Sequence, residues 1–170
     1  MKKAGEKLVI IGPVADVEYF RQYVKPHIDG TSVQYLGEVT FGVKVDYLAR
    51  ARALLYPVQY EEFFGIVMVE ALAIGTPVVG FARGSVTEII RHGVTGFLVR
   101  DIDEMARAMK LVETLDPQKY RRDVKKDSRQ KVMAEQYEKL YYSIDKCPRF
   151  MATCGIKVYP EQRYASISGI

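Results

Sequence analysis

Two acidic residues flank a glycine in the segment of this sequence that is best suited to bind an anion. Seven residues separate Glu62 from Glu70, and Gly65 lies between them, where a helix is expected to begin. The first amides of a helix have no partner within it. Here they belong to Phe64, Gly65, Ile66 and Val67. Such amides and the helix dipole bind phosphate, and glycine lets a backbone approach an anion closely. An ordinary helix start with a flexible entry is the alternative interpretation.

Glu70 is the only charged residue in the helix that follows, which is otherwise apolar and is expected over 65–73. A helix that is apolar nearly all round is typical of a buried position, where a carboxylate must accept hydrogen bonds to be stable. The vicinal hydroxyls of a ribose are suitable donors. A structural ion pair with an arginine from another element is the other explanation, and the residues do not separate the two.

Glu62 precedes the same helix by a few residues. It could cap the helix or lie in its first turn, where the helix dipole favours a negative charge. Alternatively, it faces the same cleft as the phosphate and contacts sugar hydroxyls. In that arrangement the two glutamates would hold both ends of a diphosphate-linked sugar, with the phosphates between them at 65–67.

Short apolar segments and helical segments alternate around these residues. Strands are predicted over 7–12, 32–37, 53–57, 78–81 and 97–99. Helices are predicted over about 17–27, 43–52, 65–73, 86–91, 101–115 and 117–144. This order favours a parallel sheet with helices on both faces, in which ligands bind beyond the carboxyl ends of the strands. Asp16 is expected to cap the first helix, and the first strand is expected to be buried on both faces.

Composition indicates a globular protein and excludes several classes. The chain has 170 residues, of which 48% are hydrophobic and 27% charged. Its longest apolar runs fall short of the ~20 residues of a membrane helix, and residues 1–6 do not resemble a signal peptide. We therefore expect no transmembrane segment and a cytoplasmic protein, either free or peripheral to the membrane. The net charge of +4 comes from scattered residues, which predicts no nucleic-acid partner. Cys147 and Cys154 are expected to be free thiols, and no metal site is predicted.

The spacing of the two glutamates is part of a longer pattern. Phe64-Gly65 lies within it, and 70–79 continue it as Glu-Ala-Leu-Ala-Ile-Gly-Thr-Pro-Val-Val. This pattern resembles the retaining glycosyltransferase signature of the GT-B fold, family 4 (the glycosyl transferases group 1). Further segments match family segments in the same order, over 8–12, 35–39, 51–57, 83–90 and 93–99. The resemblance extends over about 7–142.

The resemblance implies a fold, an activity and partners. The fold would be α/β, with a Rossmann-like parallel sheet flanked by helices, as in the C-terminal half of a GT-B fold. Residues 1–145 would form the donor-binding domain, without the N-terminal acceptor domain or the first strand, and 146–170 a tail whose structure the sequence does not decide. The implied activity is retaining transfer of a hexose from a UDP-, GDP- or ADP-sugar to an unknown acceptor. The family needs no metal, and no cofactor is expected. The missing N-terminal domain is an implied partner, and the chain alone is expected to be inactive.

The resemblance also implies roles for single residues. Glu62 would contact the donor sugar near the reacting centre, and Glu70 would hold the ribose. The amides of Phe64, Gly65, Ile66 and Val67 would hold the diphosphate. Gly37 and Val39 belong to a loop that would pack along the nucleobase.

The sequence departs from the family pattern in three places. Phe63 replaces a frequent proline after the first glutamate, and Glu61 adds a neighbouring carboxylate. The arginine and lysine that usually contact the diphosphate have no matching positions before Lys7. A GT-B-like epimerase or phosphorylase is the alternative enzyme, and a non-catalytic Rossmann-like nucleotide-binding or interaction module is the alternative outside enzymes.

Overall fold

The computed structural model describes residues 5–118, 121, 134–135, 137–139 and 141. The chain divides into two compact units, Met1–Ser128 and Arg129–Ile170. Most of the helix expected over 117–144 and all of 146–170, with both cysteines, lie outside the described residues. The architecture below is that of the first unit.

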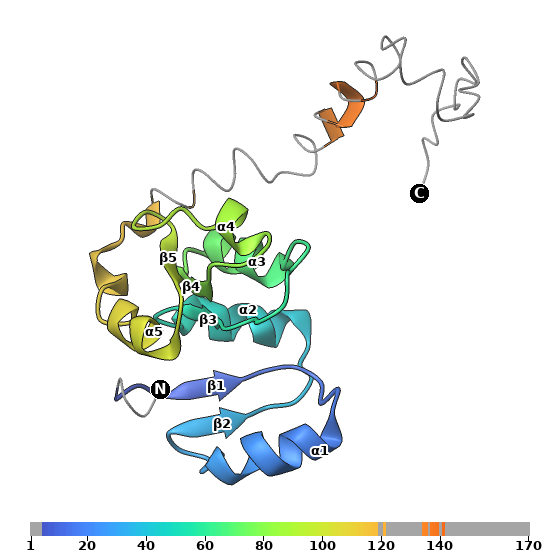
Figure 1. Ribbon diagram of the computed structural model, residues 1–170, viewed down its shortest axis with the longest axis vertical. Coiled ribbons are helices and arrows are strands. Elements are labelled where there is room, and N and C mark those ends of the chain that lie inside the picture. The colour runs from blue at the N-terminus through green and yellow to red at the C-terminus, as the bar shows by residue number, and fades with distance from the viewer. Residues whose placement is uncertain (1–4, 119–120, 122–133, 136, 140, 142–170) are drawn as a thin grey trace, which may run out of the picture. The chain divides into compact units, whose positions relative to one another are not determined.

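Strands and helices alternate along this unit, as the sequence predicts (Figure 1). The strands are β1 (Leu8–Ile10), β2 (Val33–Tyr35), β3 (Leu54–Tyr56), β4 (Val78–Phe81) and β5 (Gly96–Val99). The helices are α1 (Val17–Tyr19), α2 (Phe41–Arg50), α3 (Ile66–Ile74), α4 (Val86–Ile89) and α5 (Ile102–Ala108). Helix α1 continues as a π-helical turn over Phe20–Val24 and a 3-10 turn over Lys25–His27, and a further 3-10 turn covers Val112–Thr114.

All strand pairs are parallel, but the described strands form two hydrogen-bonded sheets instead of the single sheet expected. In the smaller sheet β1 pairs with β2, and Leu8 lies opposite Val33. In the larger sheet the order is β3-β4-β5, with Val78 opposite both Leu54 and Gly96. Helices α2 and α3 pack against each other, α3 contacts β3 and β4, and α5 contacts β4 and β5. Parallel sheets flanked by helices confirm the predicted fold class.

The hydrophobic core surrounds the larger sheet. Strand β4 lies at its centre, and all four of its residues are buried because it has a strand on each side and helices packed on it. The largest fully buried side chains are Met68, Leu72, Ile90, Val78, Val79, Val86 and Thr95. Arg52 forms ion pairs with Glu6, just before β1, and with Glu113 at 2.8 Å.

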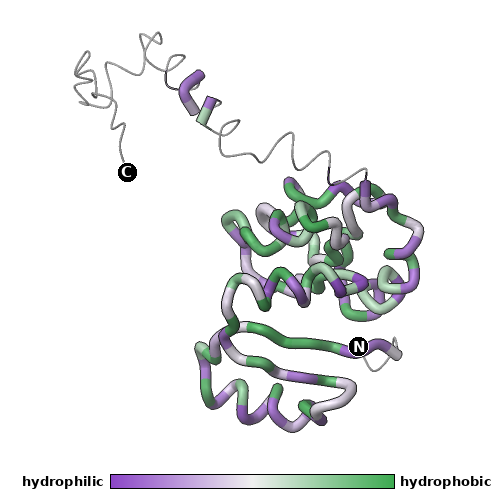
Figure 2. Tube along the Cα trace, turned by 180° about the vertical axis from the view of Figure 1, so that it is seen from behind, coloured by the Kyte–Doolittle hydropathy of each residue, from purple (hydrophilic) through white to green (hydrophobic). Residues whose placement is uncertain are grey.

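Two predictions about burial are wrong. Strand β1 is hydrophobic (Figure 2), but it is not buried on both faces, because Val9 is 37% exposed. In the described residues β1 pairs only with β2, so one of its edges has no neighbouring strand. Helix α3 is not buried all round either, since Ile66 is 64% exposed. Its buried side is formed by Met68, Ala71 and Leu72, which the helical period places on one face.

Helix boundaries also differ from the sequence prediction. The helix expected over 43–52 begins two residues earlier, since Thr40 has an extended backbone and occupies the N-cap position of α2. The helix expected over 101–115 ends at Ala108 and gives way to the 3-10 turn. The predicted cap of the first helix is confirmed, because the Asp16 carboxylate accepts a hydrogen bond from the Tyr19 amide at 2.9 Å.

Candidate functional site

Helix α3 begins where the sequence predicts, with Gly65 at its N-cap position. Gly65 has a φ of 68°, in the left-handed region that residues with a side chain rarely adopt. A Cβ atom at this position would lie 2.5 Å from Met68 Cε and 3.0 Å from the Tyr56 hydroxyl. Glycine is therefore required here both by the backbone angle and by the close approach of two side chains.

Three amides at this helix start have no hydrogen-bond acceptor in the part of the chain that the structure describes. They belong to Gly65, Ile66 and Val67. The Phe64 amide differs, because it points to Glu62 Oε1 at 3.5 Å. The Met68 amide is bonded to the Gly65 carbonyl at 2.9 Å. Three of the four predicted amides are thus available to an anion, and Ile66 is exposed to solvent.

The Glu62 carboxylate is held by two tyrosines and by its own loop. Its Oε2 accepts from the Tyr56 hydroxyl at 2.6 Å and from the Tyr60 hydroxyl at 3.2 Å. Its Oε1 accepts from the Phe63 amide at 3.0 Å. These bonds, that from Tyr56 above all, lower the pKa of Glu62 from its usual value. The carboxylate is therefore ionised and fixed in direction at neutral pH.

The pKa values of the two tyrosines are raised, whereas that of Glu62 is lowered. Burial raises the pKa of Tyr56, and its hydrogen bond to Glu62 raises it further. The nearby carboxylate charge raises the pKa of Tyr60. Both hydroxyls therefore stay protonated at neutral pH and act as donors to Glu62.

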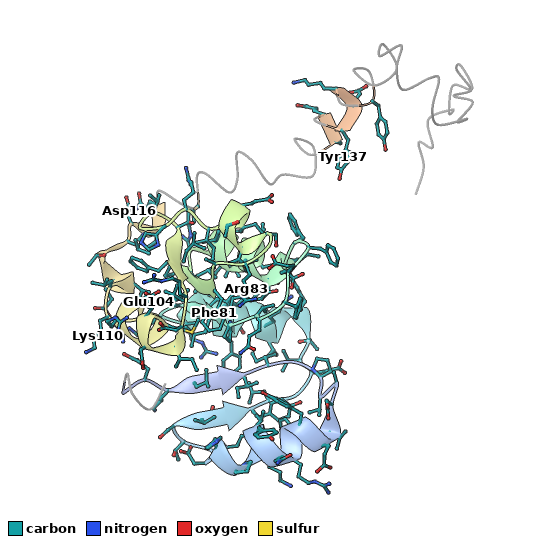
Figure 3. All side chains as sticks on the ribbon, in the orientation of Figure 1. Phe81, Arg83, Glu104, Lys110, Asp116 and Tyr137 are labelled. Carbon is teal, nitrogen blue, oxygen red and sulfur yellow. The ribbon has the colours of Figure 1, made fainter. Side chains whose placement is uncertain are left out.

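The loop after β4 fixes the backbone of Glu62. The Ser85 amide donates to the Glu62 carbonyl at 2.9 Å. A Cβ atom on Gly84 would lie 2.5 Å from that carbonyl oxygen and 2.7 Å from the Glu62 nitrogen. In the same loop, Arg83 donates to the Gln59 carbonyl at 3.0 Å, and Figure 3 shows it apart from Glu104 and Lys110. Segments 59–62 and 83–85 are thus packed together beyond the ends of β3 and β4.

Glu70 forms an ion pair, with a lysine and not with the arginine considered in the sequence. Lys44 Nζ, from α2, lies 2.8 Å from both carboxylate oxygens of Glu70. The two side chains are only 31% and 23% exposed, respectively. The ion-pair explanation of Glu70 therefore applies, and its side chain is still partly exposed.

The loop that contains Gly37 and Val39 connects β2 to α2. The Gly37 carbonyl accepts from the Gly12 amide at 2.9 Å, so the ends of β1 and β2 meet at this point. Val39 is partly buried, and Thr40 follows it at the start of α2. Lys44, on α2, pairs with Glu70, so the helix that follows this loop is linked to α3.

The predicted site residues are close in the chain, and one of them is linked across the fold. Glu62 lies in the loop before α3, the free amides lie at its start and Glu70 lies within it. The ion pair of Glu70 with Lys44 connects α3 to α2, the helix that follows the 37–39 loop. Sequence reasoning missed Lys44, Tyr56 and Tyr60. A signal for Lys44 exists, because it stands four residues before Leu48, the buried residue of α2, and so shares its packed face.

The described residues contain neither a cluster suited to a metal ion nor a helix suited to span a membrane. No group of three or more His, Cys, Asp or Glu side chains comes together there in a way that could hold a metal ion. Among the described helices, none has the length and apolar content needed to cross a membrane.

Comparisons with known sequences agree with the pattern around α3. A family model described as "Glycosyl transferases group 1" matches residues 2–131. The chain is 30% identical over 150 residues to N-acetyl-alpha-D-glucosaminyl L-malate synthase of Bacillus anthracis, which covers 81% of this chain and 38% of that protein. It is 43% identical over 70 residues to D-inositol 3-phosphate glycosyltransferase of Kribbella flavida, over 40% of this chain and 16% of that protein. The chain thus spans well under half of these relatives.

Solved structures agree on the fold. AviGT4, a glycosyltransferase involved in Avilamycin A biosynthesis, superposes with a TM-score of 0.66 and 29% identity, over 90% of this chain and 46% of that one. Anabaena Alr3699/HepE, solved in complex with UDP-glucose, superposes with a TM-score of 0.67 and 21% identity, over 82% of this chain and 43% of that one.

Proposed function

Since the chain belongs to the group 1 glycosyltransferases, we propose that it is the donor-binding half of such an enzyme and holds a nucleoside diphosphate sugar at the start of α3. The observation that carries this proposal is the row of amides at Gly65, Ile66 and Val67, which find no acceptor in the described part of the chain and lie in sequence between Glu62 and Glu70. A helix start of this kind binds the phosphates of a ligand without a side chain.

Each end of the ligand then meets one glutamate. Glu62, fixed by Tyr56 and Tyr60, accepts a hydrogen bond from a hydroxyl of the hexose at Oε1, where that hydroxyl replaces the long contact from the Phe64 amide at 3.5 Å. Glu70 accepts hydrogen bonds from the ribose hydroxyls, and the loop with Gly37 and Val39 lies along the nucleobase. The described residues do not favour one base, so UDP-, GDP- and ADP-sugars are all candidate donors.

The reaction proposed is transfer of the hexose with retention of configuration, as in family 4, and without a metal ion. The bond between the anomeric carbon and the diphosphate oxygen breaks, and the acceptor oxygen bonds to that carbon on the same face. The proton of the acceptor hydroxyl leaves with the diphosphate. The amides of α3 favour this step because they stabilise the charge that develops on the departing phosphate.

A second domain is needed for turnover in this proposal. The relatives that the chain matches are more than twice as long as the matched part, and the acceptor would bind on the part of such an enzyme that the match does not cover. We therefore expect the chain of 170 residues to bind a donor weakly and to transfer no hexose alone.

Calorimetric titration with UDP, GDP, ADP and their sugars tests the proposal. We expect one nucleoside diphosphate to bind. Glu70→Gln is expected to weaken the binding of this nucleotide more than the binding of inorganic pyrophosphate, which has no ribose. Absence of binding by all three at millimolar concentration would overturn the proposal. Equal weakening of the nucleotide and of pyrophosphate would remove the ribose role of Glu70.

A further inference from the structure

Lys44 contacts the Glu70 carboxylate symmetrically. Its Nζ lies 2.8 Å from Oε1 and 2.8 Å from Oε2, so the ammonium is shared by both oxygens. The same Nζ lies 5.1 Å from the centre of the Phe41 ring, at the start of α2. Two contacts from separate elements therefore fix the ammonium, and the ammonium fixes the carboxylate.

This pair is neither deep in the core nor on the open surface. Both side chains are less than one-third exposed. If the lysine were removed from such a position, water would only in part replace it as the partner of the carboxylate. A carboxylate offers about four lone-pair sites, so one shared ammonium leaves acceptor capacity on each oxygen. Glu70 can therefore be neutralised by Lys44 and still accept hydroxyl groups.

The position of the pair relates it to the unpaired amides. Glu70 is four residues after Ile66 on α3, and one residue of helix rises about 1.5 Å, so its Cα lies about 6 Å along the axis from that of Ile66, on the same side of the helix. Lys44 reaches this point from α2, which directly follows the loop with Gly37 and Val39. The Lys44–Glu70 ion pair thus connects the helix that follows the proposed base-binding loop to Glu70, the residue proposed to bind the ribose.

We infer that Lys44 is a positioning residue for ribose recognition: it orients the Glu70 carboxylate toward the ribose hydroxyls and is itself no ligand of the nucleotide. The inference rests on the proposed function, since it needs Glu70 to bind a ribose. It adds a residue on another helix, 26 positions away in the sequence, to the two glutamates and the amides.

The experiment compares a nucleoside diphosphate with its 2′-deoxy counterpart on the chain and on matched variants. Calorimetry with UDP and dUDP, GDP and dGDP, and ADP and dADP gives, for the pair that binds, the preference for the ribose. A hydroxyl bonded to a charged acceptor makes this preference about tenfold or more in the unchanged chain. Lys44→Met keeps the length of the side chain but removes its charge, and Lys44→Arg keeps the charge. Lys110→Met, at an exposed position after α5, is the control for the loss of one lysine.

We expect Lys44→Met to bring the preference for the ribose close to one, Lys44→Arg to retain part of it, and Lys110→Met to leave it unchanged. Thermal melting of each variant shows whether it is folded. If Lys44→Met melts earlier but keeps the full preference, Lys44 is only structural and the inference is wrong. If it weakens both nucleotides equally, Lys44 attracts the diphosphate instead, which also overturns the inference. If the unchanged chain binds a diphosphate without any preference for the ribose, the ribose role of Glu70 fails first.

Discussion

The hydroxyl of Tyr56, on the last residue of β3, lies 2.6 Å from Oε2 of Glu62. Through this hydrogen bond, a residue of the larger sheet fixes the orientation of the Glu62 carboxylate in the loop before α3. Tyr60 adds a longer bond of 3.2 Å from an exposed position. The two tyrosines therefore differ in how firmly they hold Glu62.

Tyr56→Phe is expected to weaken binding of a nucleotide sugar more than Tyr60→Phe does. The change removes the shorter bond and the main cause of the lowered pKa of Glu62, so this pKa rises toward its usual value. The nucleoside diphosphate without its sugar is expected to bind both variants as it binds the unchanged chain. Calorimetry with the two ligands measures both effects. An equal loss for sugar-bearing and sugar-free ligands would show that Tyr56 does not act through the sugar end.

Gly84→Ala is expected to destabilise the fold by more than Gly93→Ala. Both glycines have a positive φ, which costs an alanine about 1 kcal/mol. A Cβ atom on Gly84 also meets the Glu62 backbone at 2.5 Å, whereas one on Gly93 meets nothing within 4 Å. Urea unfolding of the two variants isolates the contact. Equal losses of free energy would mean that the 83–85 loop gives way without cost.

Leu72→Ala is expected to lower the free energy of unfolding by about 2–5 kcal/mol, since Leu72 is 1% exposed and its loss leaves a cavity. Ile66→Ala, on the same helix, is expected to change it by less than about 0.5 kcal/mol, because Ile66 is 64% exposed. Urea unfolding measures the difference. Similar losses at both positions would restore the view of α3 as a helix buried on all sides.

Ser85→Ala is expected to leave the free energy of unfolding unchanged or to raise it. The Ser85 hydroxyl is buried, and the described residues provide no partner for it. Thr76→Val is the contrasting change, because the Thr76 hydroxyl donates to the Leu48 carbonyl at 2.6 Å and its loss costs about 1–3 kcal/mol. Thermal melting ranks the two variants. A clear loss for Ser85→Ala would indicate that its hydroxyl is bonded in solution.

Glu104→Gln is expected to destabilise the protein at neutral pH, with a difference that disappears in acid. Hydrogen bonds from the guanidinium and the backbone amide of Arg100 lower the pKa of Glu104 to about 2, from an ordinary value of 4.5. Their stabilisation is complete above the ordinary pKa and is lost as the pH falls toward 2. Urea midpoints across this range test the effect, with Glu88→Gln, at an exposed position of α4, as the control. A difference that does not depend on pH would exclude the carboxylate as its source.

The sequence predicts the order and type of the elements because its period changes at each boundary. Five short apolar runs give β1–β5, and Gly65 gives the start of α3. The burial of β1 is mispredicted because apolar composition does not reveal how many neighbours a strand has. The division into two sheets is missed for the same reason, since it depends on which strand edges meet.

The site is predicted where it is local in sequence. Glu62, Gly65 and Glu70 lie within nine residues around the start of one helix, so their closeness follows directly from the sequence. Contacts made across the fold could not be found in this way. Lys44 is 26 residues from Glu70, and the Ser85 amide that holds the Glu62 backbone is 23 residues from it. Only the packing of α2 on α3, and of one loop on another, brings these groups together.

The amides of Gly65, Ile66 and Val67, which have no acceptor among the described residues, are main-chain groups, so only substitution by proline removes one of these N–H groups. In the proposed function, binding of the phosphates would therefore depend on the backbone shape that Gly65 secures. Substitution of a neighbouring exposed side chain such as Phe63 would leave those N–H groups in place.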